Sequence, residues 1–416
     1  MRLEVVNTGT ELLLGKVVNT HAAYFGQELF KLGLRIQRQT TIPDGAEIRT
    51  MLAEAFPRCD VILVTGGLGP TSDDITREVV AEMLGRTLHL DESILSTIRE
   101  MFRARGLKQN SLNDRQAMVP EGAVVLENPH GTAPGLYLPA DPAAGSPHLF
   151  LLPGPPRELK PMFANLVFPA LARLLGADAT LPSWKNFRIY GVGESVLAST
   201  LEPLLEGMTG LELGYCARLG EVDLRLIGTE DAVEAAAVIV RREFSNQIVV
   251  ESEAPIEQVI VDLLTERGET VATAESCTGG LIASTITDVS GSSAVFHRGY
   301  VTYANEAKTS LLGVPAEGIE AHGAVSDETV RAMAAGCLER SGADHAIAVS
   351  GIAGPTGGTE AKPAGTVHVA IASRQGGEIF AKRYFFPVDR ISFKQRVVRL
   401  ALDLLRRRIL GIPLDS

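Results

Sequence analysis

The chain has 416 residues, which is more than one hydrophobic core usually serves, so we expect about two or three domains. Hydrophobic residues make up 45% and charged residues 21%, a balance that is typical of globular proteins and excludes a largely disordered chain. The formal net charge of −11 repels a phosphate backbone, so nucleic acid is not a favoured partner.

The cysteine positions and the apolar runs bear on metal binding, disulfide formation and membrane insertion. The four cysteines, Cys59, Cys216, Cys277 and Cys337, are scattered along the chain, which indicates neither a zinc site nor a disulfide framework. Apolar runs such as 61–64 stop far short of the roughly 20 residues that a membrane span needs, and no signal peptide begins the sequence. We therefore expect a cytoplasmic protein with no membrane partner.

In the first region, residues 1–175, short apolar runs alternate with segments of helical period. This alternation is typical of βα units and a mostly parallel sheet. The expected strands are 3–6, 61–65 and 149–152, and the expected helices are 20–33, 73–84 and 159–175. We therefore predict an N-terminal α/β domain.

The second region, residues 176–250, begins where a complete α/β unit has just ended. Its pattern from Trp184 onward is strand, helix, strand, strand, helix, strand, which predicts a small α+β module. The second helix, expected at 231–244, begins acidic and ends basic, as the helix dipole favours. This module shows no catalytic constellation in its sequence.

The third region, residues 251–416, has the pattern of a further α/β domain. The expected helices are 256–267, a segment around 307–312, one from 327 that Ser326 caps, and a last helix that ends at 410. The expected strands are 270–274, 295–303, 345–349, 366–372 and 379–385. We expect the basic run 406–408 to lie on the outer face of the last helix, as a solvated helix end.

Two glycine-rich turns follow expected strands of the third region. They are Ala-Glu-Ser-Cys-Thr-Gly-Gly at 274–280 and Ser-Gly-Ile-Ala-Gly-Pro-Thr-Gly-Gly-Thr at 350–359. Ligands of open α/β sheets bind at the carboxyl ends of the strands, and free N–H groups at such turns bind anions. One such turn alone is more often only a tight connection, but the pair favours a ligand site.

Between these turns lie two adjacent serines, Ser292 and Ser293, and further along Lys308. A serine that a lysine amine activates is an alternative to the Ser-His-Asp arrangement, and such a lysine must be partly buried so that its pKa falls. The same spacing also fits a surface lysine, which is the commoner case. Cys277 is a rival nucleophile because it stands at a helix start, although a buried structural cysteine is favoured here.

Six sequence blocks of the third region resemble the CinA C-terminal family. In chain order they are 274–280, 291–293, 299–308, 322–326, 350–355 and 362–366. Members of this family hydrolyse the carboxamide of nicotinamide mononucleotide, which yields nicotinate mononucleotide and ammonia. The resemblance therefore implies a hydrolase, a nicotinamide-nucleotide amidase that needs no cofactor.

The resemblance also implies roles for single residues. Ser293 becomes the nucleophile, with Ser292 and Ser276 as alternatives, and Lys308 and Tyr303 assist its proton transfers. Ser350 lines the same catalytic pocket. The substrate would contact Ser276, Thr278, Gly279, Gly280, Gly351, Gly354 and, through its phosphate, Arg390.

Two turns of the first region, 8–15 and 65–76, place glycines, hydroxyls and carboxylates where a pyrophosphate could rest. Asp73 and Asp74 each fit a helix N-cap, but together with Glu11 they indicate a site for a divalent cation. Hard oxygen ligands of this kind suit Mg²⁺ better than zinc.

With the segments 128–135 and 152–158, these turns resemble the molybdopterin-binding-like domain of full-length CinA proteins. Joined to a CinA C-terminal region, that domain resembles a metal-dependent ADP-ribose pyrophosphatase that yields AMP and ribose 5-phosphate. The resemblance implies metal or water-activating roles for Glu11, Asp73 and Asp74. The implied ligand contacts are Asn19, Gly67, Gly69, Thr71 and Glu158. The family commonly has Asn-Thr-Asn where this chain has Asn19-Thr20-His21, so activity or base preference could differ.

The second region resembles a KH-type fold, yet it lacks a visible GxxG clamp, which argues against RNA binding. We expect it to support a homodimer. Taken together, the sequence predicts an enzyme of pyridine-nucleotide turnover that acts on nicotinamide mononucleotide and ADP-ribose. The alternatives are a competence-associated or recombination-associated binding protein and a molybdopterin-handling protein. The first is weakened because no basic groove or aromatic platform for single-stranded DNA is apparent.

Overall fold

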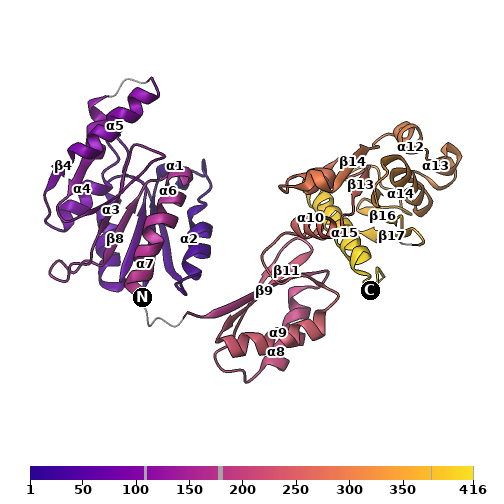
Figure 1. Cartoon of the computed structure of the whole chain (residues 1–416), viewed down its shortest axis with the longest axis horizontal. Helices are drawn as coiled ribbons and strands as arrows, with labels where there is room; N and C mark the ends of the chain where they lie inside the picture. The colour runs from indigo at the N-terminus through magenta and orange to yellow at the C-terminus, as the bar shows by residue number, and fades with distance from the viewer. Residues whose placement is uncertain (107–109, 177–180, 376, 416) are drawn as a thin grey trace. The chain divides into compact units, whose positions relative to one another are not determined.

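A computed structural model of the chain describes residues 1–106, 110–176, 181–375 and 377–415. The chain divides into an N-terminal unit, Met1–Leu181, and a C-terminal unit, Pro182–Ser416. Figure 1 shows helices packed on a sheet in the N-terminal unit and in each of the two parts of the C-terminal unit. The predicted boundary after residue 175 lies beside residues 177–180, which are outside the described residues.

The N-terminal unit is built on a six-stranded sheet in the order β2-β1-β3-β8-β7-β6. The strands are β1 (Leu3–Thr8), β2 (Ile36–Ile42), β3 (Val61–Thr65), β6 (Val124–Leu126), β7 (Gly135–Leu138) and β8 (His148–Leu152). Strands β2, β1, β3 and β8 are parallel, whereas β7 is antiparallel to both of its neighbours. The carboxyl ends of β1, β2, β3, β6 and β8 therefore share one edge of the sheet.

Helices cover both faces of this sheet because its strands are apolar on both sides. Val5 of β1 packs into one hydrophobic core and Val6 into the other, the alternation expected of a strand with two buried faces. The helices of the unit are α1 (Thr10–Leu13), α2 (His21–Phe30), α3 (Glu47–Ala55), α4 (Thr76–Met83), α5 (Glu92–Ala104), α6 (Pro156–Met162) and α7 (Phe168–Leu175). Helices α2, α6 and α7 cover the Val5 face, and α3 and α4 cover the Val6 face (Figure 1).

Several predicted elements of this unit agree with the structure, and others differ for local reasons. The predicted strand 61–65 coincides with β3. The helix predicted from residue 73 begins only at Thr76, because the preceding residues form the turn that follows β3. The sequence did not predict α5, which lies with the two-stranded sheet of β4 (Leu88–Leu90) and β5 (Met118–Pro120).

The C-terminal unit opens with a middle module whose element order is the predicted one. Its elements are β9 (Ser183–Tyr190), α8 (Glu194–Leu205), β10 (Glu212–Ala217), β11 (Glu221–Gly228), α9 (Glu230–Phe244) and β12 (Ile248–Val250). The strands form an antiparallel sheet in the order β10-β11-β9-β12. Both helices pack on one face of it, around Phe187 and Leu224.

The rest of the unit, the C-terminal domain, has a five-stranded sheet in the order β14-β13-β15-β16-β17. The strands are β13 (Val271–Glu275), β14 (Phe296–Val301), β15 (His345–Gly351), β16 (Thr366–Ser373) and β17 (Phe380–Phe385). The helices are α10 (Ile256–Arg267), α11 (Leu281–Thr287), α12 (Asn305–Leu312), α13 (Ala316–His322), α14 (Asp327–Ser341) and α15 (Arg390–Leu410). Strands β13, β14 and β15 are parallel, so their carboxyl ends meet at one edge.

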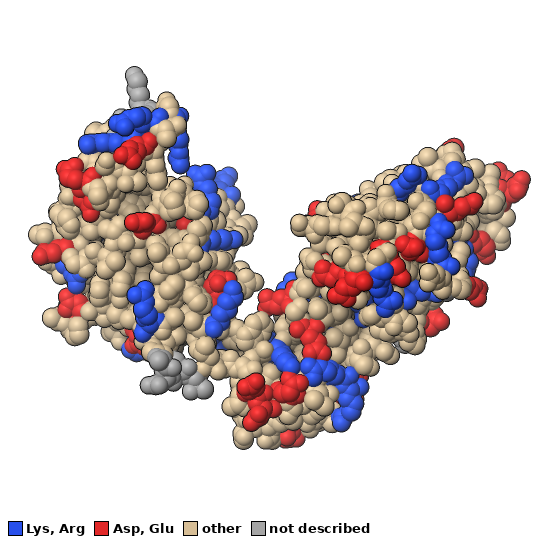
Figure 2. All heavy atoms as spheres, in the orientation of Figure 1, with Lys and Arg blue, Asp and Glu red and all other residues tan. Residues whose placement is uncertain are grey.

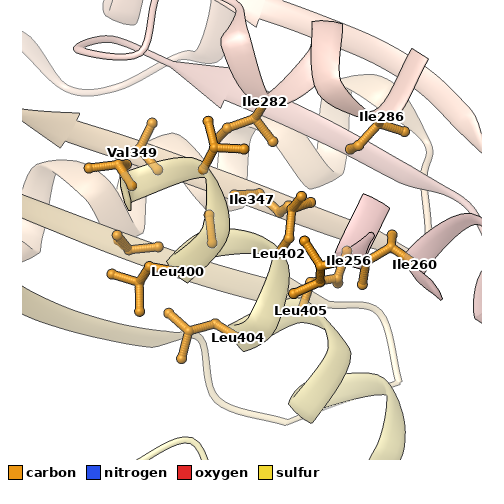
Figure 3. Close-up of a cluster of buried hydrophobic side chains, with 14 of the residues drawn as sticks. Ile256, Ile260, Ile282, Ile286, Ile347, Val349, Leu400, Leu402, Leu404 and Leu405 are labelled. Atoms are coloured by element: carbon orange, nitrogen blue, oxygen red, sulfur yellow. The ribbon is translucent and has the colours of Figure 1, made fainter. Parts of the chain in front are cut away.

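Two apolar layers hold this domain together. Figure 3 shows one of them, in which Ile256 of α10, Ile282 of α11 and Leu402 of α15 surround Ile347 of β15. Each fully buried side chain of this size contributes roughly 1.5–3 kcal/mol. The opposite face packs against α14, whose predicted cap is confirmed because Ser326 accepts a hydrogen bond from the N–H of Thr329.

The basic run near the end of α15 differs from the prediction. Arg406 and Arg407 are only 1% and 5% exposed. Both donate to Asp403, with distances of 2.9 Å from Arg406 Nε to Oδ1 and 2.7 Å from Arg407 Nε to Oδ2. Arg406 also donates to the carbonyl of Asn246 in the middle module at 3.1 Å. The predicted solvated helix end was wrong, because the middle module packs over it.

The surface of the protein carries both acidic and basic side chains (Figure 2). Figure 2 shows acidic and basic side chains on both units, on the face that it draws. Within the described ranges, the helices are too short or too polar to cross a bilayer.

The buried triad around Asp403 gives a first prediction. Asp403→Asn keeps the side-chain shape but leaves two buried guanidinium groups without their counter-charge, which costs about 3 kcal/mol or more of unfolding free energy. In calorimetry of the full chain, we expect the transition of the C-terminal unit to fall by roughly 6–12 °C. Glu243→Gln, which breaks the exposed pair with Arg242, is the control and should change little. Equal transitions for both variants would contradict the role of the triad.

Candidate active sites

The C-terminal domain brings three loops together at the carboxyl edge of its sheet. The N–H of Ser276 donates to the carbonyl of Val349 at 3.0 Å, which joins the turn that follows β13 to the end of β15. The N–H of Thr302 donates to the carbonyl of Glu275 at 2.8 Å, which joins the segment after β14 to the same turn. Both predicted glycine turns therefore lie beside the segment that carries Lys308.

Lys308 is the central residue of this edge. It lies in α12 and is 1% exposed, so the commoner case of a surface lysine does not hold. Its Nζ lies 2.9 Å from the carbonyl oxygen of Thr302 and 3.3 Å from Oγ of Ser276. Burial lowers the pKa of the Lys308 amine, against weaker opposing effects of Cys277 and Glu306. A buried amine beside a hydroxyl meets the condition that a lysine base requires.

The shape of the first glycine turn depends on a residue that the sequence did not single out. Glu275 is fully buried, and its carboxylate accepts hydrogen bonds from Thr278 Oγ1 at 2.7 Å, from the N–H of Ile282 at 2.9 Å and from the N–H of Ala283 at 2.8 Å. These bonds tie the start of α11 to the end of β13 and so position Ser276. The available signal was a carboxylate at the end of an apolar strand, directly before the turn.

Ser293 does not meet Lys308 within the chain. It is exposed in a short 3₁₀ turn, Ser292–Ala294, which comes before β14. In the register of the sheet, Phe296 pairs with the first residue of β13 and Val301 with the last. Ser292 and Ser293 therefore lie at the amino edge, about one strand length from Lys308, on the order of 15–20 Å. The expected pairing of Ser293 with Lys308 is corrected to Ser276, because order in sequence does not reveal which end of a strand a residue occupies.

Arg390 connects the rim of this site. One of its guanidinium nitrogens donates to the carbonyl of Gly354 at 3.0 Å and the other to the hydroxyl of Tyr303 at 3.1 Å. The Tyr303 hydroxyl thus contacts Arg390, and only its main-chain carbonyl faces Lys308. Ser350 is 1% exposed and donates to the carbonyl of Ala324 at 2.6 Å. These predicted residues do gather around one edge.

Gly351 and Cys277 have structural roles at this edge. A Cβ on Gly351 would lie 2.8 Å from the carbonyl oxygen of Thr366, so a larger residue would push β15 and β16 apart. Cys277 is 5% exposed, and burial raises the pKa of its thiol to about 12. The interpretation of Cys277 as a buried structural cysteine is confirmed.

The N-terminal unit has an analogous edge, at which glycines allow close contact between loops. Gly66 and Gly67 adopt φ angles of 95° and 67°, a region that disfavours other residues. A Cβ on Gly66 would lie 2.5 Å from the carbonyl oxygen of Thr8, and one on Gly67 would collide with the hydroxyl of Thr76. The turns after β1 and β3 therefore contact each other as the sequence predicts for a shared site.

The predicted metal residues lie at this edge but do not gather into one cluster. Asp74 accepts hydrogen bonds from the N–H of Thr71, at 2.9 Å, and from its hydroxyl, and its carboxylate occupies the space beside Gly69. Asp73 and Glu11 are exposed or partly so on neighbouring turns. Across the described ranges, no three His, Cys, Asp or Glu side chains lie close enough to hold a metal ion among themselves. One or two carboxylates with substrate phosphates are a usual Mg²⁺ site, so these residues still fit such an ion.

Asp44 is a further acidic residue at this edge that the sequence analysis missed. It follows β2, and its Oδ2 accepts hydrogen bonds from the N–H of Thr10 at 2.9 Å and from the Thr10 hydroxyl at 3.2 Å. The signal was a Pro-Asp-Gly turn at 43–45, but it was not used because β2 itself was not predicted.

Glu158, a predicted ligand contact of the N-terminal unit, lies next to Asn128. Asn128 Nδ2 donates to Glu158 Oε2 at 2.8 Å, and Glu158 fills the space beside Gly131. Asn128 and Gly131 line a cleft of about 520 Å³ between α5 and residues 127–134, whereas Glu158 is not among the described residues that line it. Glu158 is thus buried and already hydrogen-bonded, which suits a loop-positioning role as well as ligand contact.

His21 replaces the usual asparagine in a buried position. Its exposed fraction is 8%, and Nδ1 lies 3.4 Å from the hydroxyl of Thr65. Burial lowers the pKa of the His21 imidazole, so the ring is mostly neutral. Asn19 does not face the turns with its side-chain oxygen, which instead accepts from the N–H of His21 at 3.0 Å. His21, at which this chain differs from the Asn-Thr-Asn pattern, therefore lies next to Thr65 at the end of β3, just before the glycine turn.

Comparison with known proteins covers the whole chain. A CinA-like protein of Akkermansia muciniphila is 49% identical, over 97% of this chain and 96% of its own length. The chain belongs to the CinA family. A competence-damage inducible protein of Symbiobacterium thermophilum is 47% identical, over 99% of both chains. The crystal structure of competence/damage inducible protein CihA from Agrobacterium tumefaciens is 45% identical and covers 37% of this chain and 93% of that one, with a TM-score of 0.36.

Three family descriptions match consecutive parts of this CinA chain. They are the probable molybdopterin binding domain at residues 4–173, the damage-inducible protein CinA KH domain at 184–248 and the CinA C-terminal domain at 253–409. The predicted full-length CinA order and the mixed α/β fold class are therefore confirmed.

The cysteines of this CinA protein give a second prediction. Cys216 is exposed, whereas Cys59, Cys277 and Cys337 are buried, and burial raises the pKa of each buried thiol to about 12. At pH 8, a disulfide reagent such as dithiobis-nitrobenzoate should label one thiol of the native chain and four after denaturation. Cys216→Ser should abolish native labelling and Cys277→Ala should not change it. Rapid native labelling that is lost in Cys277→Ala would contradict the structural role of Cys277.

Proposed function

We propose that the C-terminal domain is a nicotinamide-nucleotide amidase in which Ser276 is the nucleophile and Lys308 the general base. The observation that carries the proposal is the 3.3 Å contact between Lys308 Nζ and Ser276 Oγ in a buried setting. Burial lowers the pKa of the amine, which increases its neutral, proton-accepting fraction near neutral pH. The amidase reaction itself comes from the family resemblance of the six sequence blocks.

The geometry supports a two-step hydrolysis. The neutral Lys308 amine accepts the Ser276 hydroxyl proton while Oγ attacks the carboxamide carbon. The resulting ammonium then donates this proton to the amide nitrogen as the C–N bond breaks, so that the nitrogen leaves as ammonia. Water then attacks the acyl-serine ester, with the same amine as the base, and releases the carboxylate product.

Mutations at Ser276, Lys308 and Ser293 test this assignment. Ser276→Ala and Lys308→Met should each lower ammonia release from nicotinamide mononucleotide by at least about a thousand-fold, because nucleophile and base act as a unit. The double mutant should be little worse than either single mutant. Ser293→Ala, a matched change at an exposed serine on the opposite edge, should retain most activity. Loss of activity in Ser293→Ala with retention in Ser276→Ala would overturn the assignment.

The pH profile of the same assay tests the role of Lys308. The base form is the neutral amine, so kcat/KM should rise with pH through the lowered pKa of Lys308 and level off below its ordinary value of 10.5. A profile that is flat or falls over this range would show that another group is the base.

We propose that the N-terminal unit is a metal-dependent ADP-ribose pyrophosphatase. Its support is the turn after β3, in which Gly66 and Gly67 contact Thr8 and Thr76 and the Asp74 carboxylate lies beside Gly69, within a region that matches a probable molybdopterin binding domain. A bound Mg²⁺ would polarise the pyrophosphate and its water. Asp73 and Asp74 would hold the ion from this turn, with Glu11 on the neighbouring turn after β1. The alternative is that the same turns of the N-terminal unit bind molybdopterin.

Metal removal separates the two proposed activities. Chelation should abolish ADP-ribose hydrolysis and leave ammonia release unchanged, because the proposed amidase residues are a serine and a lysine. Asp74→Asn should reproduce the effect of chelation on ADP-ribose, whereas Glu54→Gln on the exposed side of α3 should not. If chelation stops both reactions of a folded protein, the assignment of metal to the N-terminal unit is wrong.

An alternative for the whole chain is a competence-associated binding role, which is suggested by the names of relatives such as the competence-damage inducible protein of Symbiobacterium thermophilum. A protein with that role alone would release ammonia from nicotinamide mononucleotide no faster than Ser276→Ala. The cytoplasmic setting and the homodimer stay expectations, and light scattering measures the second.

A further inference from the structure

A pair of cations borders the first glycine turn of the C-terminal domain. Arg390 and Lys394 are four residues apart at the start of α15, so they lie on the same side of the helix. Arg390 is held against Gly354 and Tyr303 by its two hydrogen bonds. The Lys394 ammonium lies near Gly279, because a Cβ built on Gly279 would be 3.9 Å from Nζ of Lys394. The two positive groups therefore stand at the rim of the turn that carries Ser276.

Neither Arg390 nor Lys394 forms an ion pair with a carboxylate of the described residues. Lys394 forms no ion pair or side-chain hydrogen bond with any described residue. Two acids of the adjoining segments are engaged elsewhere, because Asp389 caps α15 through the N–H groups of Ile391 and Ser392, and the Glu275 carboxylate is buried in its own turn. In a chain with a net charge of −11, an unpaired positive rim beside a candidate nucleophile points to an anionic ligand.

We propose that Lys394 is the residue by which this site distinguishes a phosphorylated substrate from its unphosphorylated counterpart, with Arg390 as the second cation. A phosphomonoester carries about −1.5 to −2 charges at pH 7, which matches two cations better than a single carboxylate would. Lysine and arginine on one helix side bind separate phosphate oxygens through charge-assisted hydrogen bonds. The Lys394 ammonium lies beside the main chain of Gly279, in the same turn as Ser276.

This inference rests on the proposed amidase function and adds the selection of its substrate. Lys394 does not touch Ser276 or Lys308, so it acts on binding and leaves the chemical step unchanged. Its loss should therefore raise KM for a nucleotide and should not change kcat for that nucleotide or either constant for a nucleoside.

The test compares nicotinamide mononucleotide with nicotinamide riboside in the full chain. Lys394→Met should raise KM for the mononucleotide about ten-fold or more, with kcat nearly unchanged and the constants for the riboside unaffected. Lys394→Arg keeps the charge and should recover most of the difference. Lys382→Met, which removes a lysine of β17 that pairs with Asp415, is the control and should affect neither substrate.

Each outcome decides between these possibilities. Equal losses with both substrates would show a structural role, and unchanged constants would show that Lys394 does not contact the phosphate; either result overturns the inference. If the wild-type chain releases ammonia from neither compound, the proposed function fails and calorimetric binding decides instead. Wild type should then bind the mononucleotide more tightly than the riboside, and Lys394→Met should abolish that preference; an equal preference in both proteins would overturn the inference.

Discussion

A lysine amine becomes a useful base near neutral pH only where burial makes its charged form costly, and Lys308 of this CinA-family protein lies in such a setting. Lys308 is 1% exposed, and its Nζ is surrounded by carbonyl oxygens and the Ser276 hydroxyl. Within the described residues it forms no ion pair with a carboxylate, which would otherwise keep the amine protonated. The lowered pKa of Lys308 therefore follows from where the fold places α12.

The surrounding structure serves to hold Ser276 next to that amine. Parallel strands align the ends of β13, β14 and β15, and main-chain hydrogen bonds of Ser276 and Thr302 lock the three loops together. Glu275 adds a buried carboxylate that closes the turn through three hydrogen bonds. Such a network is costly when partly satisfied, so it specifies one turn conformation. The N-terminal unit uses the same kind of sheet edge, with Gly66 and Gly67 in place of a buried acid.

The middle module contributes through packing. The predicted order of its strands and helices agrees with the structure, but its contact with the last helix was not visible in the sequence. Arg406 and Arg407 look like a solvated helix end because a local charge pattern contains no information about distant segments. In the structure they are buried with Asp403 against the carbonyl of Asn246, which lies far away in the sequence.

The sequence by itself determined the fold class, the element order and the glycine turns, because hydrophobic period and turn residues act over a few neighbours. It also singled out segments that meet at one edge of the sheet in the structure, including Lys308, Arg390 and the turn at 274–280. It did not determine which serine faces Lys308. Ser276 and Ser293 both lie next to β strands, but one follows its strand and the other precedes it. Only the parallel register of β13 and β14 decides that these serines lie at opposite edges of the sheet, and only the tertiary structure buries Lys308, which the sequence alone leaves open to be a surface cation.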